Sequence, residues 1–244
     1  MLNDYGLDYD AILINGDSYS ASDGDKVYGN FLGEMLNIPV KNIARAGSNN
    51  QRIVRSTIEE INNFKQQYKN PLVLIGWSFI RRLEVWYYGN HPKVLRRIPD
   101  RSDAVEEHLQ PRLITLDILL KEKEATLEQK CLINEDLFVH KQLVDFYTNL
   151  FMLAHFLESM SVEYFFFSAA KNTEIPTNSF PYIDNLQQVK WCQQNKNMYK
   201  LHDFCVLDWA KVNDKDCKPT GHLSLAGHEQ FAKLMINMIK ESTC

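Results

Sequence analysis

The sequence has little of what marks exported, membrane or nucleic-acid-binding proteins. Its five cysteines are widely spaced and form no CxxC pair, and its strongest apolar run, 164–167, is far shorter than the roughly 18 residues of a membrane span. A net charge of −4 provides no basic field that would hold nucleic acid or an anionic membrane. We therefore expect a protein with free thiols that binds neither of them.

The N-terminal residues also lack the basic start and the apolar stretch of a signal peptide. On this ground we expect a cytoplasmic protein, with the alternative that a phage-encoded or otherwise exported protein leaves its cell without such a peptide. Ten Gly and eight Pro are too few for a linker-rich chain, and 45% hydrophobic with 24% charged residues is the balance of a globular protein. The length of 244 residues suits one domain, 1–244.

Short apolar runs alternate with amphipathic segments along most of the chain. The runs predict strands, and apolar residues three and four positions apart predict helices. This alternation favours an α/β fold, a three-layer α/β/α sandwich with a mostly parallel, five-stranded sheet between layers of helices. The expected strands cover residues 11–14, 37–44, 71–76, 162–168 and 204–208, and the expected helices cover 27–36, 50–68, 137–160 and 229–240.

The alternation breaks at about 86–135, which we interpret as an insertion over the edge of the sheet, partly helical near 113–121. The segment is charged and contains three prolines and a basic patch. With the aromatic residues nearby, the patch is a candidate contact for nucleic acid, but the chain is acidic overall and a solvated loop is favoured. The patch consists of Lys93, Arg96, Arg97 and Arg101.

In parallel sheets the chemistry lies at the carboxyl ends of the strands, so the residues that follow each strand are candidates for a site. The first strand is followed by Gly16-Asp17-Ser18, which puts Ser18 near the N-terminus of the next helix. Unpaired N–H groups and the helix dipole there favour an anion, including an oxyanion formed beside a serine. The alternative is that Asp17 or Ser18 only caps the helix.

Two further loops carry polar residues of the same kind. After the second strand, Gly47 lets its backbone N–H approach a ligand closely and Asn49 offers an amide donor, although a turn and a helix cap also explain the pair. Near the C-terminus, His222 lies in a loop where it can act as a base toward a serine, while His228 begins the last helix. A zinc site built from these histidines and the nearby cysteines fails on spacing.

Together these blocks resemble the SGNH/GDSL hydrolase family, of which the chain would be a divergent member. The resemblance is carried by Gly16 to Ser20 after the first strand, by Gly47 to Asn50 after the second, and by His222 followed by Gly227-His228. It implies a flavodoxin-like α/β/α sandwich. It also implies an esterase that works through an acyl-enzyme and needs no metal or organic cofactor.

By position, the resemblance implies that Ser18 is the nucleophile and His222 the general base, and that the backbone N–H groups of Ser18 and Gly47 hold the oxyanion. One departure affects this oxyanion hole. The family carries Gly-x-Asn-Asp after the third strand, and Ser78 stands here in place of the asparagine. A hydroxyl can donate but is shorter, and Asn49 is the candidate that would compensate.

A second departure concerns the acid that orients the histidine. The family places an aspartate three residues before it, where this chain has Pro219. Asp216 is the first candidate if the intervening loop bulges, with Asp214 and Asp208 nearby; without an acid, a Ser-His dyad would work more slowly. Trp77, at the end of the third strand, is a candidate to line the substrate site.

We therefore expect a serine hydrolase that cleaves an ester, namely an O-acetyl or other short acyl group on a carbohydrate or small metabolite. Its partner would be a small-molecule or glycan ester, with no nucleic acid, membrane, metal or cofactor. Two alternatives stay open. A degraded site on the same fold would serve binding or assembly, and an acyltransferase would use the same serine with an acceptor other than water.

Overall fold

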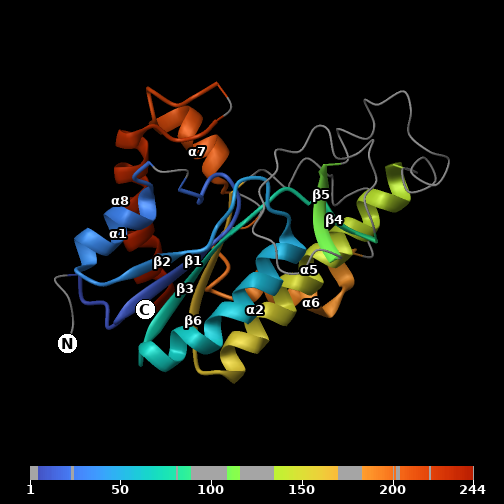
Figure 1. Ribbon diagram of the computed structural model, residues 1–244, viewed down its shortest axis with the longest axis horizontal. Helices are drawn as coiled ribbons and strands as arrows, with labels where there is room; N and C mark the ends of the chain where they lie inside the picture. Colours follow the sequence, from blue (N-terminus) through green and yellow to red (C-terminus); the bar gives the residue numbers. More distant parts are fainter. Residues whose placement is uncertain are drawn as a thin grey trace.

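A computed structural model describes residues 5–22, 25–80, 82–88, 109–115, 135–169, 183–199, 201, 204–219 and 221–243. Its centre is a four-stranded sheet in the order β2-β1-β3-β6, and every neighbouring pair of these strands is parallel (Figure 1). The strands are β1 (Ala11–Asn15), β2 (Val40–Asn42), β3 (Pro71–Trp77) and β6 (Glu163–Ser168). The predicted α/β fold with a parallel sheet between helices is confirmed.

Helices cover both faces of this sheet (Figure 1). One face carries α1 (Tyr28–Leu36), α7 (Val206–Asn213) and α8 (Leu225–Thr243). The other face carries α2 (Asn50–Gln67), α5 (Glu135–Ser159) and α6 (Gln187–Gln194), with the short 3-10 turn η3 (Ile183–Asn185) before α6. In the described part of the chain, no helix has the length and apolar character needed to cross a membrane.

The two helical layers explain why β1 and β3 are apolar along their whole length. Strands of a parallel sheet are buried on both faces, so their sequences do not alternate between apolar and polar residues. Every residue of β1 and β3 is buried. Successive side chains still point to opposite faces. Leu13 thus packs in the core beneath α2 and α5, whereas Ile12 packs beneath α1 and α8.

The expected fifth strand at 204–208 is not a strand. Cys205 instead caps a helix, because its Sγ accepts a hydrogen bond from the backbone N–H of Asp208 at 3.4 Å, and α7 begins at Val206. Among the described residues, the outer edge of β6 carries one isolated parallel bridge, between Phe166 and Met198. The described sheet therefore has four strands instead of the expected five. The prediction failed because a short apolar run does not by itself distinguish a strand from the first turn of a buried helix.

The expected helix near 113–121 is also wrong where the structure describes it. Residues 113–115 belong to β5 (Leu109–Thr115), which pairs antiparallel with β4 (Arg82–Tyr88) in a separate two-stranded sheet. The aromatic and β-branched residues of β4 favour an extended backbone, and pairing with β4 fixes β5 in the same conformation. Residues 116–121 and the four basic residues of the patch lie outside the described residues.

Candidate functional site

The residues after β1 form a tight turn at the carboxyl edge of the sheet. The backbone N–H groups of Ser20 and Ala21 both donate to the carbonyl of Asp17, at 3.0 and 2.9 Å, which closes one helix-like turn around Ser18. Gly16 allows this turn to lie against β3, because a Cβ atom at Gly16 would stand only 2.9 Å from the carbonyl oxygen of Gly76. Ser18 thus projects from the sheet edge at a fixed place.

His222 meets this turn from the opposite end of the chain. Its Nε2 lies 2.9 Å from Ser18 Oγ, within hydrogen-bond distance, although the two residues are 204 positions apart in the sequence. Both side chains are half-buried. A hydroxyl in hydrogen-bond contact with an imidazole is the arrangement in which histidine can remove the hydroxyl proton.

Backbone and carboxylate contacts hold the loop that carries His222. Gly221 has φ +81°, a conformation that favours glycine, and its N–H donates to the carbonyl of Lys218 at 2.7 Å. The N–H of Lys218 donates in turn to the carbonyl of His222 at 3.0 Å. Beyond the histidine, the buried Asp214 accepts from the N–H and the hydroxyl of Ser224, at 2.6 and 2.7 Å, just before α8 begins.

Tyr19 lies against the face of the His222 ring. The two ring centroids are 4.6 Å apart and the ring planes differ by 2°, so the rings are stacked. Tyr19 is buried, and this burial, together with the charge of Asp17, raises the pKa of its phenol to about 12. The phenol therefore stays neutral at ordinary pH.

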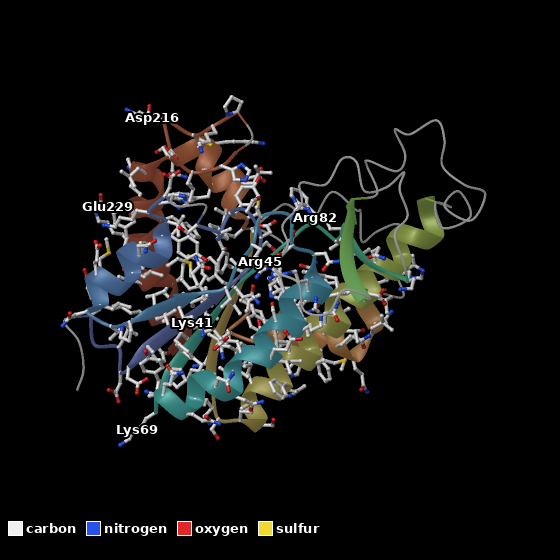
Figure 2. All side chains as sticks on the ribbon, in the orientation of Figure 1. Lys41, Arg45, Lys69, Arg82, Asp216 and Glu229 are labelled. Carbon is white, nitrogen blue, oxygen red and sulfur yellow. The ribbon has the colours of Figure 1, made fainter. Side chains whose placement is uncertain are left out.

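Asp17, the residue before the nucleophile candidate, is fully buried and held by three donors. Its Oδ2 accepts from Arg82 Nη1 at 2.9 Å and from Ser78 Oγ at 2.7 Å, and its Oδ1 accepts from the Tyr19 N–H at 3.1 Å. Burial raises the pKa of the Asp17 carboxyl, against the opposing effects of Arg82 and of Ser78. Figure 2 shows Arg82 at the junction between the sheet and the β4–β5 hairpin.

The start of α2 adds a third group of residues to this edge. Gly47, with φ +78°, turns the chain toward the helix, and Asn49 caps it by accepting the N–H of Arg52 on its Oδ1 at 2.8 Å. This bond fixes which end of the Asn49 amide is which. Its Nδ2 is buried and has no hydrogen-bond partner among the residues that the structure describes. Arg82 Nη1 also donates to the carbonyl of Ser48 at 3.2 Å, which ties this helix start to Asp17.

His228 does not contact Ser18 but binds the start of α1. Its Nδ1 accepts the backbone N–H of Tyr28 at 3.3 Å, one of the N–H groups that have no partner within the first turn of α1. Burial is the main reason why the pKa of His228 is lowered to about 4. The ring is therefore neutral at pH 7 and can accept this bond.

Among the described residues, no group of three or more His, Cys, Asp or Glu is placed so that it could hold a metal ion. Cys205 caps α7, and His222 faces Ser18. The site as described consists of a hydroxyl, an imidazole, amide groups and a buried ion pair. This is the chemistry of proton transfer and oxyanion binding.

The sequence also matches a protein family along most of its length. The profile of a family of unknown function, DUF6071, matches residues 20–238. The chain belongs to this family. The matched range begins just after Ser18 and includes the whole loop that carries His222. No curated protein matches the sequence.

Solved structures with which this DUF6071 member can be superimposed are named as lipolytic proteins and esterases. One is described as a lipolytic protein of the G-D-S-L family from Desulfitobacterium hafniense, with 11% identity, a TM-score of 0.45, and coverage of 94% of this chain and 99% of that chain. Another is the psychrotrophic esterase EstA from Pseudoalteromonas sp., with 17% identity, a TM-score of 0.42, and coverage of 96% of each chain.

Two residues of this DUF6071 chain that the sequence suggested for the oxyanion or substrate site have other contacts. Ser78 is fully buried and directs its hydroxyl to Asp17, so this proton is not offered to a substrate. Trp77 lies in the core, with its ring edge-to-face against Phe146 and Phe166 at 5.8 and 5.4 Å. The strand alternation of β3 turns Trp77 toward α5, so it does not line a substrate site.

Asp216 is not placed against His222 either. It is exposed at the far end of the turn after α7 (Figure 2), and its N–H donates to Oδ1 of Asp214 at 3.2 Å. Within the described residues, no hydrogen bond joins its carboxylate to the imidazole. Asp214 is buried but binds Ser224 and so secures the start of α8. The expectation that Asp216 orients the base is thus corrected.

The role of Arg82 was the main feature of the site that the sequence left open. Arg81 and Arg82 both follow the third strand, and either could line the site on sequence grounds. A buried aspartate needs a cationic or hydrogen-bonding partner, and the nearby arginines are candidates to pair with Asp17 on this ground. The rule cannot say which arginine does so, because the pairing depends on how β4 leaves the sheet.

Proposed function

We propose that this protein is a serine hydrolase that cleaves a carboxylic ester through an acyl-enzyme on Ser18. The proposal rests on one observation above all, the 2.9 Å separation of Ser18 Oγ and His222 Nε2 at the carboxyl edge of the sheet. A serine hydroxyl is a weak nucleophile until a base takes its proton. The stacked and hydrogen-bonded imidazole of His222 supplies a base in position to do this.

In the proposed reaction, Ser18 Oγ attacks the ester carbonyl while His222 Nε2 takes the hydroxyl proton. The carbonyl oxygen becomes an oxyanion, held by the backbone N–H groups of Ser18 and Gly47 and by Nδ2 of Asn49. The imidazolium then gives its proton to the departing alcohol. Water, deprotonated by the same imidazole, attacks the acyl-enzyme and releases the carboxylic acid and free Ser18.

The buried amide of Asn49 supports its part in this proposal. A buried donor without a partner costs free energy, about 1–3 kcal/mol, unless a ligand accepts its hydrogen bond. Asn49 Nδ2 is such a donor, while its Oδ1 is occupied by the cap of α2. The amide of Asn49 would thereby do what the hydroxyl of Ser78, engaged with Asp17, does not.

For the substrate we propose an O-acetyl or other short acyl ester of a carbohydrate or small metabolite, as expected from the sequence. A series of p-nitrophenyl esters of increasing acyl length tests this class. We expect the highest kcat/KM with acetate or propionate. Faster turnover of an octanoate ester would refute the short-acyl part of the proposal and leave the nucleophile untouched.

A fluorophosphonate probe, which reacts with activated serine hydroxyls, tests the nucleophile. We expect covalent labelling of the native protein at Ser18 and none in Ser18→Ala. Ser22→Ala is the matched control, because Ser22 is an exposed serine in the same segment, and its hydroxyl donates to the carbonyl of Asp25. Labelling that persists in Ser18→Ala would show that the wrong nucleophile is named. No labelling of the native protein would favour a binding module.

Two further variants test the base and the amide. His222→Ala should abolish p-nitrophenyl acetate hydrolysis above the blank. Asn49→Ser keeps an oxygen that can cap α2 but has no amide, so we expect kcat to fall by about 10²–10³ with little change in stability. Unchanged kcat in Asn49→Ser would remove this residue from the oxyanion hole. If methanol or a sugar accepts the acyl group faster than water, the protein is an acyltransferase on the same serine.

A further inference from the structure

We infer that Tyr19 is a positioning residue of the general base, because its ring fixes the plane of the His222 imidazole and stabilises the imidazolium formed during the reaction. This inference rests on the proposed function, and it adds a residue that the proposed mechanism does not use. Tyr19 directly follows the nucleophile in the sequence. Consecutive residues of one turn therefore hold the base at its edge and on its face.

The two contacts constrain different motions of the imidazole. The hydrogen bond to Ser18 Oγ fixes the position of Nε2 but lets the ring tilt about that point. The stack on Tyr19, with planes 2° apart and centroids 4.6 Å apart, removes the tilt. Together they hold the ring plane and keep Nε2 toward the serine.

Tyr19 can act in this way because it is itself immobilised. Its backbone N–H donates to Oδ1 of Asp17 at 3.1 Å, and Asp17 is anchored in turn by Arg82. The ring is 5% exposed. On the side of the histidine loop, a Cβ atom at Gly221 would already meet Leu207 at 2.0 Å and the Tyr19 hydroxyl at 3.6 Å. The phenol is thus enclosed on the side from which the His222 loop approaches.

The ring also favours the charged form of the base. An aromatic face carries the negative part of the ring quadrupole, so a cation on that face is attracted to it. His222 becomes a cation when it takes the Ser18 proton. In a triad, an acid orients the imidazole and stabilises the imidazolium. The Tyr19 ring contributes to both tasks, and it does so without a charge because the phenol stays neutral.

Several charged groups act on His222 besides the ring, and the test must hold them constant. Asp17 attracts the imidazolium, and His228 would repel it if it were protonated. The charge of Arg82 lowers the pKa of Asp17, and the charge of Asp214 raises the pKa of His228. A change confined to the Tyr19 side chain leaves all four groups in place, so a shift in the pKa of His222 would report the ring.

The experiment compares Tyr19→Phe, which keeps the ring, with Tyr19→Leu and Tyr19→Met, which do not. The His222 pKa is measured by NMR titration, and the second-order rate of fluorophosphonate labelling is measured from pH 5 to 9. In the two variants without a ring, we expect a lower His222 pKa and labelling slowed by about five- to thirtyfold. Tyr19→Phe should restore most of the rate and a pKa near that of the native protein.

Leu36→Ala is the stability control, since Leu36 is buried in the same core but lies at the end of α1. It should lower stability and leave the His222 pKa unchanged. A His222 pKa that is the same in Tyr19→Leu and the native protein would overturn the inference, as would an equal loss of labelling in Tyr19→Phe. The titration needs no catalysis, so an unlabelled native protein would refute the proposed function without deciding the role of Tyr19.

Discussion

The buried ion pair next to Ser18 in the sequence offers the sharpest test of how the site is built. Asp17 is 0% exposed and Arg82 is 16% exposed, and they are in contact at 2.9 Å. Replacing Arg82 with Met keeps an apolar side chain but removes the charged guanidinium, whose Cζ also lies 4.8 Å from the centroid of the Phe79 ring. The carboxylate of Asp17 is then left with its two neutral donors, Ser78 and the Tyr19 N–H.

The cost of this change follows from the burial of the pair. Removing one partner of a buried ion pair typically costs 3–5 kcal/mol, because the other charge is left without compensation. Arg82 is partly exposed and Asp17 keeps two hydrogen bonds, so we expect a loss of about 3 kcal/mol in the free energy of unfolding at pH 8. The double variant Asp17→Asn with Arg82→Met should lose less than the sum of the single changes, since no charge is then left buried alone.

The pH dependence provides a second signature of the same pair. Burial already raises the pKa of folded Asp17, and loss of Arg82 should raise it further. An acid whose folded pKa lies above its unfolded pKa adds stability at low pH, and this stability is lost as pH rises through the folded pKa. The deficit of Arg82→Met relative to the native protein should therefore shrink as pH falls from 8 toward 4.

Urea unfolding followed by tryptophan fluorescence at pH 8, 6 and 4.5 measures these quantities. The native protein, both single variants, the double variant and Arg82→Lys form one set. Arg82→Lys should recover part of the stability, because a lysine keeps the charge but contacts fewer groups. If Arg82→Met is as stable as the native protein at pH 8, or its deficit is the same at every pH, Asp17 is not a buried charge held by this arginine.

Three further predictions concern the loop that carries His222 and the start of α8 that follows it. Asp216→Asn should leave kcat unchanged, whereas Asp214→Asn should lower the free energy of unfolding by about 1 kcal/mol through loss of the cap of α8; a lower kcat in Asp216→Asn would reinstate it as the acid. Gly221→Ala should destabilise the protein and slow Ser18 labelling, because a φ of +81° is strained for alanine and because the new methyl group would collide with Leu207. An unchanged melting temperature would contradict this. Between pH 6.5 and 4, His228 is protonated in the unfolded chain but not in the folded protein, so lowering the pH over this range favours unfolding. As the pH falls, the native protein should therefore lose stability faster than His228→Asn, and thermal melts over this range measure the difference.

Much of the fold was predictable because the interior strands leave a strong mark in the sequence. The runs at 11–14 and 71–76 are buried on both faces, so they are apolar throughout, and the polar residues that follow them mark the carboxyl edge. At the edge of the sheet the sequence pattern is less distinctive. The run at 204–208 reads equally well as a strand or as the first turn of a buried helix, and the cap formed by the Cys205 thiol decides for the helix.

The candidate site was predictable only where its residues belong to short contiguous blocks. Ser18 and His222 lie in two such blocks, and the structure brings them together as the sequence suggested. Trp77 was misplaced because a sequence shows that neighbouring strand residues point to opposite faces but does not say which face carries the site. Ser78 follows the strand and lies at the site, but no spacing in the sequence shows that its hydroxyl is engaged by Asp17. The pairing of Arg82 with Asp17 depends on the path of β4, which no local pattern in the sequence determines.

The topology explains why these particular residues meet. From β1 the chain passes through α1 on one face of the sheet to β2, and from β2 it returns through α2 on the other face to β3. At the carboxyl edge, β1 is followed by α1 on one face of the sheet, whereas β3 leads on to α5 on the other face, so the loops that leave β1 and β3 diverge there. The bond between Ser78 Oγ and Asp17 Oδ2, 2.7 Å long, joins these two loops at their start. Ser18 follows Asp17 at this edge, and the loop before α8 brings His222 Nε2 to 2.9 Å from its hydroxyl, so residues from both ends of the chain meet where the two loops part.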